Sequence, residues 1–244
     1  MEGHAFVVLG ATGGTGAALS RRVASRGGRL VLAARDQGRL DALSTELGAP
    51  ALSIDAAEAE DVERAVELCR TEHGRFDGIV NAAGSILLRP AHMTKLDDFD
   101  AVVRQNLRTA FATVHVGAKG LRKEGGSIVL FSSAAARTGL PNHEAIAAAK
   151  AGVQGLTLSA SATYARAGIR VNCVAPGLVD TTMAAAITRS EKALEASRAM
   201  HPLGRIGAPE DVARAAEWLL DPDQSWVTGQ ILGVDGGLGS ARPA

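Results

Sequence analysis

Short runs of apolar and β-branched residues alternate with segments of helical periodicity along the whole chain. The apolar runs cover residues 5–9, 29–33, 51–54, 78–80, 127–131, 170–174 and 230–234. The helical segments cover residues 15–26, 38–47, 58–73, 96–122, 143–166 and 208–220. Several runs are apolar at even and odd positions alike, which is typical of parallel strands buried on both faces. The alternation therefore predicts an α/β fold, a doubly wound parallel sheet of seven strands with helices on both faces, in the order 3-2-1-4-5-6-7.

Composition narrows the class of protein. The 244 residues carry 26 basic and 26 acidic side chains, so the net charge is zero. This balance argues against a general nucleic-acid binder or a membrane-surface binder, and no apolar run reaches the roughly 18 residues of a membrane span. Cys69 and Cys173 lack the spacing of a disulfide framework or a zinc site, which favours buried thiols, no metal and a cytoplasmic location.

No linker or change in composition divides the chain, so we expect one domain over residues 1–244. Residues 181–200 form an apolar helical insertion between the sixth strand and the last helix. An insertion there lies outside the carboxyl ends of the strands, where open α/β sheets bind ligands. We expect either a lid that closes over a small-molecule substrate or a helix that packs on the surface.

A glycine-rich loop follows the first predicted strand and reads Gly10-Ala11-Thr12-Gly13-Gly14-Thr15-Gly16. Its position between a strand and a helix is that of a Rossmann-type phosphate loop. Glycines there permit a tight turn and let backbone N–H groups approach a pyrophosphate at the helix N-terminus. The loop predicts a dinucleotide cofactor.

The tip of the second predicted strand bears on the choice of cofactor. An NAD site usually places a carboxylate there to accept the ribose 2′-hydroxyl. Here Ala34 is followed by Arg35, whose planar guanidinium suits a 2′-phosphate. Asp36 is the complication, because it can pair with Arg35 or face the ribose. We favour NADP(H) over NAD(H); the alternative is an arginine that only meets solvent.

Motifs along nearly the whole chain resemble the short-chain dehydrogenase/reductase family, in its short, ketoacyl-reductase-like branch. The loop fits both the G-x-x-x-G-x-G spacing of the short branch and the G-x-x-G-x-x-G spacing of the longer branch. The short length and the C-terminal motifs Pro209-Glu210-Asp211-Val212-Ala213 and Val234-Asp235-Gly236-Gly237 favour the short branch. The resemblance implies a homotetramer and these cofactor contacts: Gly10, Thr12, Gly13, Gly14, Thr15, Gly16, Arg35, Asp55, Asn81, Ala82, Ala83, Gly84, Lys150, Pro176, Gly177, Val179 and Thr181.

The resemblance also implies catalytic positions. Asn106 matches a structural asparagine of a proton relay, Ser133 matches the serine that hydrogen-bonds the substrate oxygen, and Lys150 matches the lysine that binds the nicotinamide ribose. The family motif is Y-x-x-x-K, but the residue four before Lys150 is Ile146. Ile146 lies 13 residues after Ser133, which fits the register and indicates a substitution. Tyr164, the single tyrosine, is not followed by lysine four residues later.

Without the tyrosine, its role as general acid is open. Loss of one general acid typically costs ~10²–10⁴ in rate. His143 lies seven residues before Lys150, so a helix places both on one side. The alternatives for His143 are a catalytic histidine, as in the wider Y-x6-K spacing of an enoyl reductase branch, or a partly exposed residue in the first turn after an Asn142 cap.

Three hypotheses for function follow. The first is an NADP(H)-dependent reductase with altered proton transfer, which suits an activated alkene better than a ketone, because water can protonate carbon. The second is a catalytically silent nucleotide-binding sensor or scaffold. The third is an inactive subunit of a hetero-oligomer with an intact relative. Turnover of NADPH, or its absence when the cofactor is bound, separates the first from the others.

Overall fold

Seven parallel strands form one sheet in the order β3-β2-β1-β4-β5-β6-β7, and this confirms the predicted topology. The computed structural model describes residues 1–241. Each strand begins and ends within two residues of its predicted range, and the bounds are β1 Ala5–Leu9, β2 Arg29–Ala34, β3 Ala51–Ser53, β4 Gly78–Asn81, β5 Gly126–Phe131, β6 Ile169–Pro176 and β7 Ile231–Val234. The chain therefore has the doubly wound, Rossmann-type architecture.

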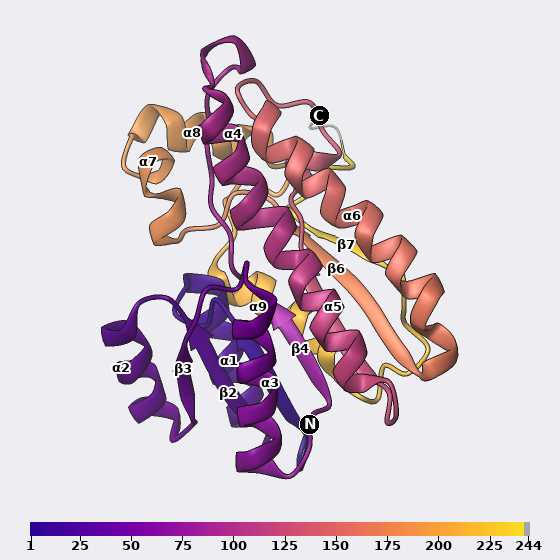
Figure 1. Ribbon diagram of the computed structural model, residues 1–244. Coiled ribbons are helices and arrows are strands. Elements are labelled where there is room, and N and C mark those ends of the chain that lie inside the picture. The colour runs from indigo at the N-terminus through magenta and orange to yellow at the C-terminus, as the bar shows by residue number, and fades with distance from the viewer. Residues whose placement is uncertain (242–244) are drawn as a thin grey trace.

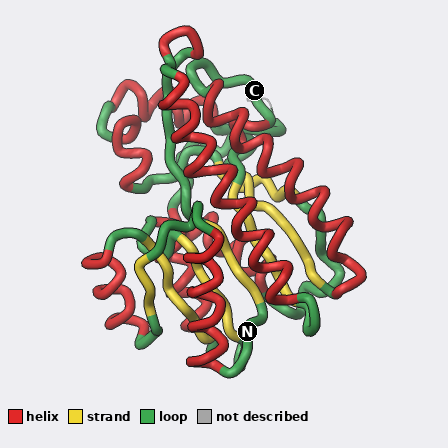
Figure 2. The backbone as a smooth tube through the Cα atoms, in the orientation of Figure 1, coloured by secondary structure: helices red, strands yellow, loops and turns green. Residues whose placement is uncertain are grey.

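Helices cover both faces of this sheet (Figure 1). One face carries α3 (Ala59–His73), α5 (Thr109–Leu121) and α6 (Glu144–Tyr164). The other carries α1 (Gly14–Ser25), α2 (Gln37–Leu47) and α9 (Pro209–Leu220). Figure 2 shows the strands between these two layers. This arrangement matches the predicted helices on both faces.

Alternate residues of each central strand enter two separate cores. Val7 and Leu9 of β1 pack with α3 and α5, whereas Phe6 and Val8 pack with α1 and α9. All four side chains are fully buried. A strand covered on both faces has no solvent-facing side, which is why these runs are apolar at both parities.

The predicted helix 96–122 contains a π-helical turn. It comprises α4 (Leu96–Val103), the π turn Arg104–Arg108 and α5. The backbone stays right-handed at both junctions, so the three segments form one continuous rod. Asn106 lies in the wide turn, a feature often found at functional sites.

The insertion at residues 181–200 is not one helix. It contains a short turn at Thr182–Ala184, α7 (Ala185–Thr188) and α8 (Glu191–Met200). Ser190 separates the two helices, and its hydroxyl accepts a hydrogen bond from Ala193 N. A serine at an N-cap favours the start of a new helix, which explains the break. Figure 1 shows α7 and α8 beyond the carboxyl ends of the strands.

Two further observations concern the described residues, 1–241. None of their helices combines the length and apolar character needed to cross a membrane. No group of three or more His, Cys, Asp or Glu side chains within the same range is arranged to hold a metal ion.

Candidate active site

The loop between β1 and α1 presents bare backbone at the carboxyl edge of the sheet. Gly10 has φ +74°, and a Cβ there would lie 2.5 Å from Ala83 N. A Cβ on Gly16 would collide with the Gly10 carbonyl oxygen. The N-cap of α1, Gly13, has no capping side chain, and the first turn, which starts at Gly14, has no acidic residue. The uncapped N–H groups and the room left by the glycines fit a pyrophosphate.

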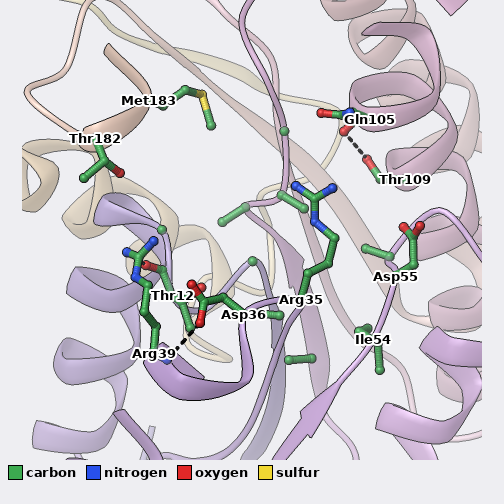
Figure 3. A pocket seen from close by; sticks show the side chains of 18 residues that line it. Thr12, Arg35, Asp36, Arg39, Ile54, Asp55, Gln105, Thr109, Thr182 and Met183 are labelled. Atoms are coloured by element: carbon green, nitrogen blue, oxygen red, sulfur yellow. Dashed lines mark hydrogen bonds between the residues drawn. The ribbon is translucent and has the colours of Figure 1, made fainter. Parts of the chain in front are cut away.

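A cavity of about 530 Å³ opens beside this loop (Figure 3). Its walls come from the phosphate loop, the end of β2, the segment after β3, the end of β4 and the start of the 181–200 insertion. The predicted cofactor residues in its wall are Gly10, Thr12, Gly13, Arg35, Asp55, Ala82, Ala83 and Gly84. The fold therefore brings these predicted residues together in one place.

The two charged residues at the tip of β2 differ in their surroundings. Asp36 is the N-cap of α2, and its Oδ1 accepts a hydrogen bond from Arg39 N at 3.1 Å. The Arg35 guanidinium extends into the cavity, and no hydrogen bond or ion pair to it is found within residues 1–241 (Figure 3). One oxygen of Asp36 is thus engaged by its own helix, while the Arg35 guanidinium has no hydrogen-bond partner among the described residues.

Arg39 is a second cation in this wall. Its guanidinium donates to the carbonyl oxygen of Thr12, which holds it against the phosphate loop (Figure 3). Sequence analysis did not single out Arg39. Its place in the first turn of α2, directly after the strand tip, could have indicated it.

Asp55 lies on the opposite wall. Its Oδ2 forms an ion pair with Arg104 at 2.9 Å, and its Oδ1 accepts from Ala57 N at 3.0 Å. Burial by itself would raise the pKa of Asp55, but the Ala57 N–H and the Arg104 guanidinium together hold it below its ordinary value. The carboxylate is therefore charged and fixed at the cavity edge.

A second cavity, of about 220 Å³, adjoins the first and shares Gly13, Ala82, Ala83, Gly84, Thr182 and Met183 with it. It extends from the phosphate loop to the ends of β5 and β6. The predicted residues that line it are Gly13, Gly14, Thr15, Gly16, Ala82, Ala83, Gly84, Asn106, Ser133, Ile146, Lys150, Pro176, Gly177, Val179 and Thr181. Asn81 does not line either cavity; it is buried behind the wall, where its Oδ1 accepts from Ala83 N.

Lys150 is buried at the inner end of this cavity, on α6. Its Nζ donates to the Phe131 carbonyl oxygen at 2.8 Å, and its own carbonyl oxygen accepts from Ser132 Oγ at 2.8 Å. Burial lowers the pKa of Lys150 from the ordinary 10.5 to about 8. The end of β5 therefore holds this lysine at both its backbone and its ammonium.

Asn106 lies across the cavity from Lys150. Its Nδ2 donates to Val102 O at 2.9 Å and to Ser85 Oγ at 3.1 Å, and its Oδ1 accepts from Ser85 N at 3.3 Å. A Cβ on Gly84 would lie 2.9 Å from Asn106 Oδ1 and 3.5 Å from Lys150 Nζ. Only glycine leaves the space between these two polar groups open.

Ser133 and Ile146 complete the inner wall. Ser133 follows β5, and its Oγ accepts a hydrogen bond from Ala135 N at 3.2 Å, so its hydroxyl proton is available to a ligand. Ile146 stands one turn before Lys150 on α6 and is 5% exposed. It packs with Phe99 and Leu107 in a small apolar cluster. The wall next to Ser133 therefore offers no hydrogen bond at position 146.

His143 lies outside the cavity. It is the N-cap residue of α6, which begins at Glu144, and its Nδ1 is 2.8 Å from the Pro141 carbonyl oxygen. Asn142, the expected cap, instead takes a left-handed conformation with φ +64°. An Asn side chain tolerates this conformation better than most, so Asn142 turns the loop and the helix starts one residue later.

The segment after β6 forms the remaining wall. A Cβ on Gly14 would lie 2.7 Å from Thr181 Cγ2, so this segment touches the phosphate loop. Leu178 N donates to Nε2 of His201 at 3.2 Å, and Nδ1 of His201 is 2.6 Å from the Ser197 carbonyl oxygen. His201 thus ties the end of α8 to this segment. Sequence analysis did not identify His201, because its contacts depend on the tertiary fold.

Known proteins match this chain over almost its whole length. The family model described as enoyl-(acyl carrier protein) reductase matches residues 10–239. The 3-oxoacyl-(acyl-carrier-protein) reductase FabG of Thermotoga maritima is 35% identical, with 98% of each chain covered.

Solved structures of similar proteins also superpose on almost the whole chain. A short-chain type dehydrogenase/reductase from Mycobacterium ulcerans superposes with a TM-score of 0.93 at 29% identity, covering 100% of this chain and 92% of the other. A single-residue variant of actinorhodin polyketide ketoreductase, solved with NADPH, gives 0.91 at 30% identity, with 98% of each chain covered. The fold, the cavity at the carboxyl edge and these matches together show that the chain belongs to the short-chain dehydrogenase/reductase family.

Proposed function

We propose that this protein is an NADP(H)-dependent reductase of a small apolar molecule, with an active site that lacks the motif tyrosine. The observation that carries the proposal is the pair of adjoining cavities. One begins at Arg35 and the uncapped α1 N-terminus, and the other ends at Ser133 and Lys150. When bound, the dinucleotide supplies a hydride to a polarised C=O or C=C bond.

Residues of this chain fit such a cofactor. The glycine loop leaves space where Cβ atoms would collide with backbone, and the α1 N–H groups favour the pyrophosphate. Arg35 and Arg39 flank the place that a 2′-phosphate would take, and Asp36 is occupied as a helix cap. This use of Asp36 at the β2 tip supports NADP(H) over NAD(H). The similar ketoreductase structure contains NADPH.

The substrate end is largely apolar. Ile146 forms part of the inner wall, and Ile86 and Met183, which are 37% and 48% exposed, lie at the mouth. We propose that Ser133 donates to the substrate oxygen, where negative charge develops during reduction. An apolar acyl chain or ring next to that oxygen fits this wall.

The missing tyrosine affects the choice of substrate. A ketone needs a proton on oxygen as the alkoxide forms, whereas a conjugated enoyl group can be protonated later at carbon by water. Without the phenol, a rate loss of ~10²–10⁴ is expected for ketones. We therefore propose an activated alkene as the preferred acceptor and a ketone as a slower one.

Three further features belong to the proposal. Residues 181–200 close over the substrate as a lid, because Thr182 and Met183 line both cavities. The chain assembles as a homotetramer through α5 and α6, whose small residues allow close approach. The protein works in the cytoplasm, where the buried thiols of Cys69 and Cys173 stay reduced.

The test measures NADPH binding and NADPH consumption separately. Fluorescence titration gives the Kd for NADPH and NADH, and the loss of NADPH absorbance in the near ultraviolet is then followed with a panel of ketones and enoyl thioesters. We expect tighter binding of NADPH and turnover of at least one enoyl compound. Tight NADPH binding without turnover of any acceptor would reject the reductase and favour a silent nucleotide-binding protein.

A further inference from the structure

The π turn Arg104–Arg108 belongs to a wall that both cavities share. Gln105 in this turn and Thr109 directly after it line the first cavity (Figure 3), and Asn106 lines the second. A π turn is wider than the α-helical turn it replaces, and such turns are rare. If the segment became regular α-helix, its side chains would face other directions, because successive residues of an α-helix are about 100° apart. The shape of this wall therefore depends on what holds the turn.

Asn106 is the residue through which the turn affects the second cavity. Its side chain is buried and forms two hydrogen bonds with Ser85, which also lines that cavity. Ser85 Oγ accepts one of these bonds at 3.1 Å, so the hydroxyl proton of Ser85 is available to a ligand. A rotation of Asn106 would therefore move a hydrogen-bond donor in the wall of the substrate cavity.

One carboxylate holds both ends of the π turn. Glu58 Oε1 accepts from Arg104 Nη2 at 2.6 Å, and Glu58 Oε2 accepts from Arg108 Nη2 at 3.2 Å. Arg104 is the first residue of the turn and Arg108 is the last. Arg104 also pairs with Asp55 at 2.9 Å, and Arg108 Nε donates to Ala57 O at 2.9 Å. The segment between β3 and α3 thus contacts the turn at its start and at its end.

This segment is itself fixed by hydrogen bonds. Asp55 N donates to Asp61 Oδ2 at 2.7 Å, and Ala57 N donates to Asp55 Oδ1 at 3.0 Å. Glu58 N donates to Asp55 O at 3.0 Å, and Glu58 is the N-cap residue of α3. A carboxylate on a fixed backbone restrains the arginines that it meets, and through them the π turn.

The ion pairs of Glu58 meet solvent. The side chains of Glu58 and Arg104 are each 42% exposed, and that of Arg108 is 59% exposed. An exposed ion pair contributes little by itself. Here two pairs share one carboxylate, and their arginines lie four residues apart, so each pair limits the movement of the other. Because the groups are exposed, salt should screen both pairs.

We propose that Glu58 is a positioning residue of this active site. It is not among the described residues that line the two cavities. It bridges Arg104 and Arg108, restrains the π turn between them, and thereby places Asn106 and Ser85 in the wall of the second cavity. The effect on turnover rests on the proposed reductase function, whereas the effect on Asn106 requires neither cofactor nor substrate.

The chain offers a matched control for this bridge. Glu63 of α3 pairs with Lys119 of α5 at 2.8 Å, and the Glu63 side chain is 44% exposed. This pair also joins α3 to the rod formed by α4, the π turn and α5, but it lies beyond the turn. Within the described part of the chain, neither residue lines the two cavities. Glu63→Gln therefore removes an ion pair of similar exposure and leaves the contacts of the turn in place.

The first experiment observes Asn106 in the cofactor-free protein. Nitrogen-15 labelling of asparagine gives few NMR signals, since the chain has four asparagines: Asn81, Asn106, Asn142 and Asn172. The side-chain amide signal of Asn106 is assigned by its loss in Asn106→Asp. Glu58→Gln should shift this signal and speed its hydrogen exchange by ~2–30-fold, the effect of two exposed ion pairs. Glu63→Gln should change neither. The same shift and exchange rate in Glu58→Gln as in the wild type overturns the inference.

The second experiment measures turnover of an uncharged enoyl thioester or ketone at saturating NADPH. Glu58→Gln should lower kcat/KM for the acceptor by the same ~2–30-fold. The Kd for NADPH should change less, because Arg35, Arg39 and the phosphate loop keep their places. Added salt should lower kcat/KM of the wild type toward that of Glu58→Gln, which should itself respond little. Glu63→Gln should keep the salt response of the wild type, and so should a variant that has only lost stability.

The outcomes distinguish the two proposals. A changed Asn106 signal in Glu58→Gln, with lower kcat/KM and a lost salt response, supports both. Unchanged kcat/KM in Glu58→Gln rejects the positioning role and leaves the reductase intact. A wild type that binds NADPH but never turns over rejects the reductase, and the Asn106 signal then decides by itself whether Glu58 holds the π turn.

Discussion

The carboxylate of Asp36 accepts a hydrogen bond from the backbone N–H of Arg39, at 3.1 Å, as the cap of α2. This bond engages Oδ1 of the acidic side chain at the β2 tip, which lines the cofactor cavity together with Arg35 and Arg39. The proposed preference for NADP(H) therefore depends on the guanidinium groups of Arg35 and Arg39, and the next experiment tests it.

Arg35→Ala and Arg39→Ala should each weaken NADPH binding and leave NADH binding nearly unchanged. A hydrogen bond to a charged group contributes about 1.5–3 kcal/mol, so each change should raise the Kd for NADPH by ~10–150-fold. Fluorescence titration of the variants and the wild type with NADPH and with NADH measures the Kd for each dinucleotide. Arg122→Ala, at an exposed position that follows α5 and lines neither cavity, is the control and should leave both Kd values unchanged. Equal loss of NADPH and NADH binding would contradict a 2′-phosphate role.

Ile146→Tyr should increase the rate of ketone reduction. A phenol one turn before the Lys150 ammonium meets a cation that lowers its pKa, and it supplies the proton donor that isoleucine lacks. We expect kcat to rise by ~10²–10⁴ for a ketone and less for an enoyl thioester. Ile146→Phe is the matched control, because it adds the ring without the hydroxyl. An equal gain in both variants would mean that ring volume, not proton transfer, limits the rate.

Gly10→Ala should abolish cofactor binding and destabilise the fold. The residue has φ +74°, and the new Cβ would lie 2.5 Å from Ala83 N, a backbone atom that cannot move alone. Gly48→Ala is a close control, since Gly48 also has positive φ, +61°, but a Cβ there meets nothing within 4 Å. Positive φ costs of order 1–3 kcal/mol in both variants. Urea unfolding should show a larger loss of unfolding free energy for Gly10→Ala than for Gly48→Ala. Equal losses in the two variants would mean that the collision does not destabilise the fold.

His201→Ala should loosen the wall formed by residues 177–181. His201 is 2% exposed, and its two ring nitrogens bond Leu178 N and Ser197 O. Its removal leaves both backbone groups unpaired, at about 1–3 kcal/mol of unfolding free energy. Because this wall touches the phosphate loop through Thr181, the Kd for NADPH should rise as well. Denaturant unfolding and fluorescence titration measure the two effects, and the exposed His92→Ala should change neither.

The amino-acid sequence determined the layers and the topology of this fold. Apolar runs at both parities, as in Phe6 to Leu9, are forced by strands that pack on both faces, so they can be recognised locally. The glycine loop is also local, because the close approach of backbone to backbone at Gly10 and Gly16 excludes every other residue. The same reasoning identified Arg35, since its position at a strand tip follows from strand and loop alone.

The tertiary structure decided how the groups in the site act. The lowered pKa of Lys150 depends on burial by β5, β6 and the helices around it, and the availability of Arg35 depends on Asp36 being used as a cap. The hydrogen bond from Leu178 N to His201 joins two positions 23 residues apart, which only the tertiary fold brings together. Hydrophobic periodicity in the sequence shows which side of a helix or strand is buried. These properties depend instead on which other segment of the chain packs against that side.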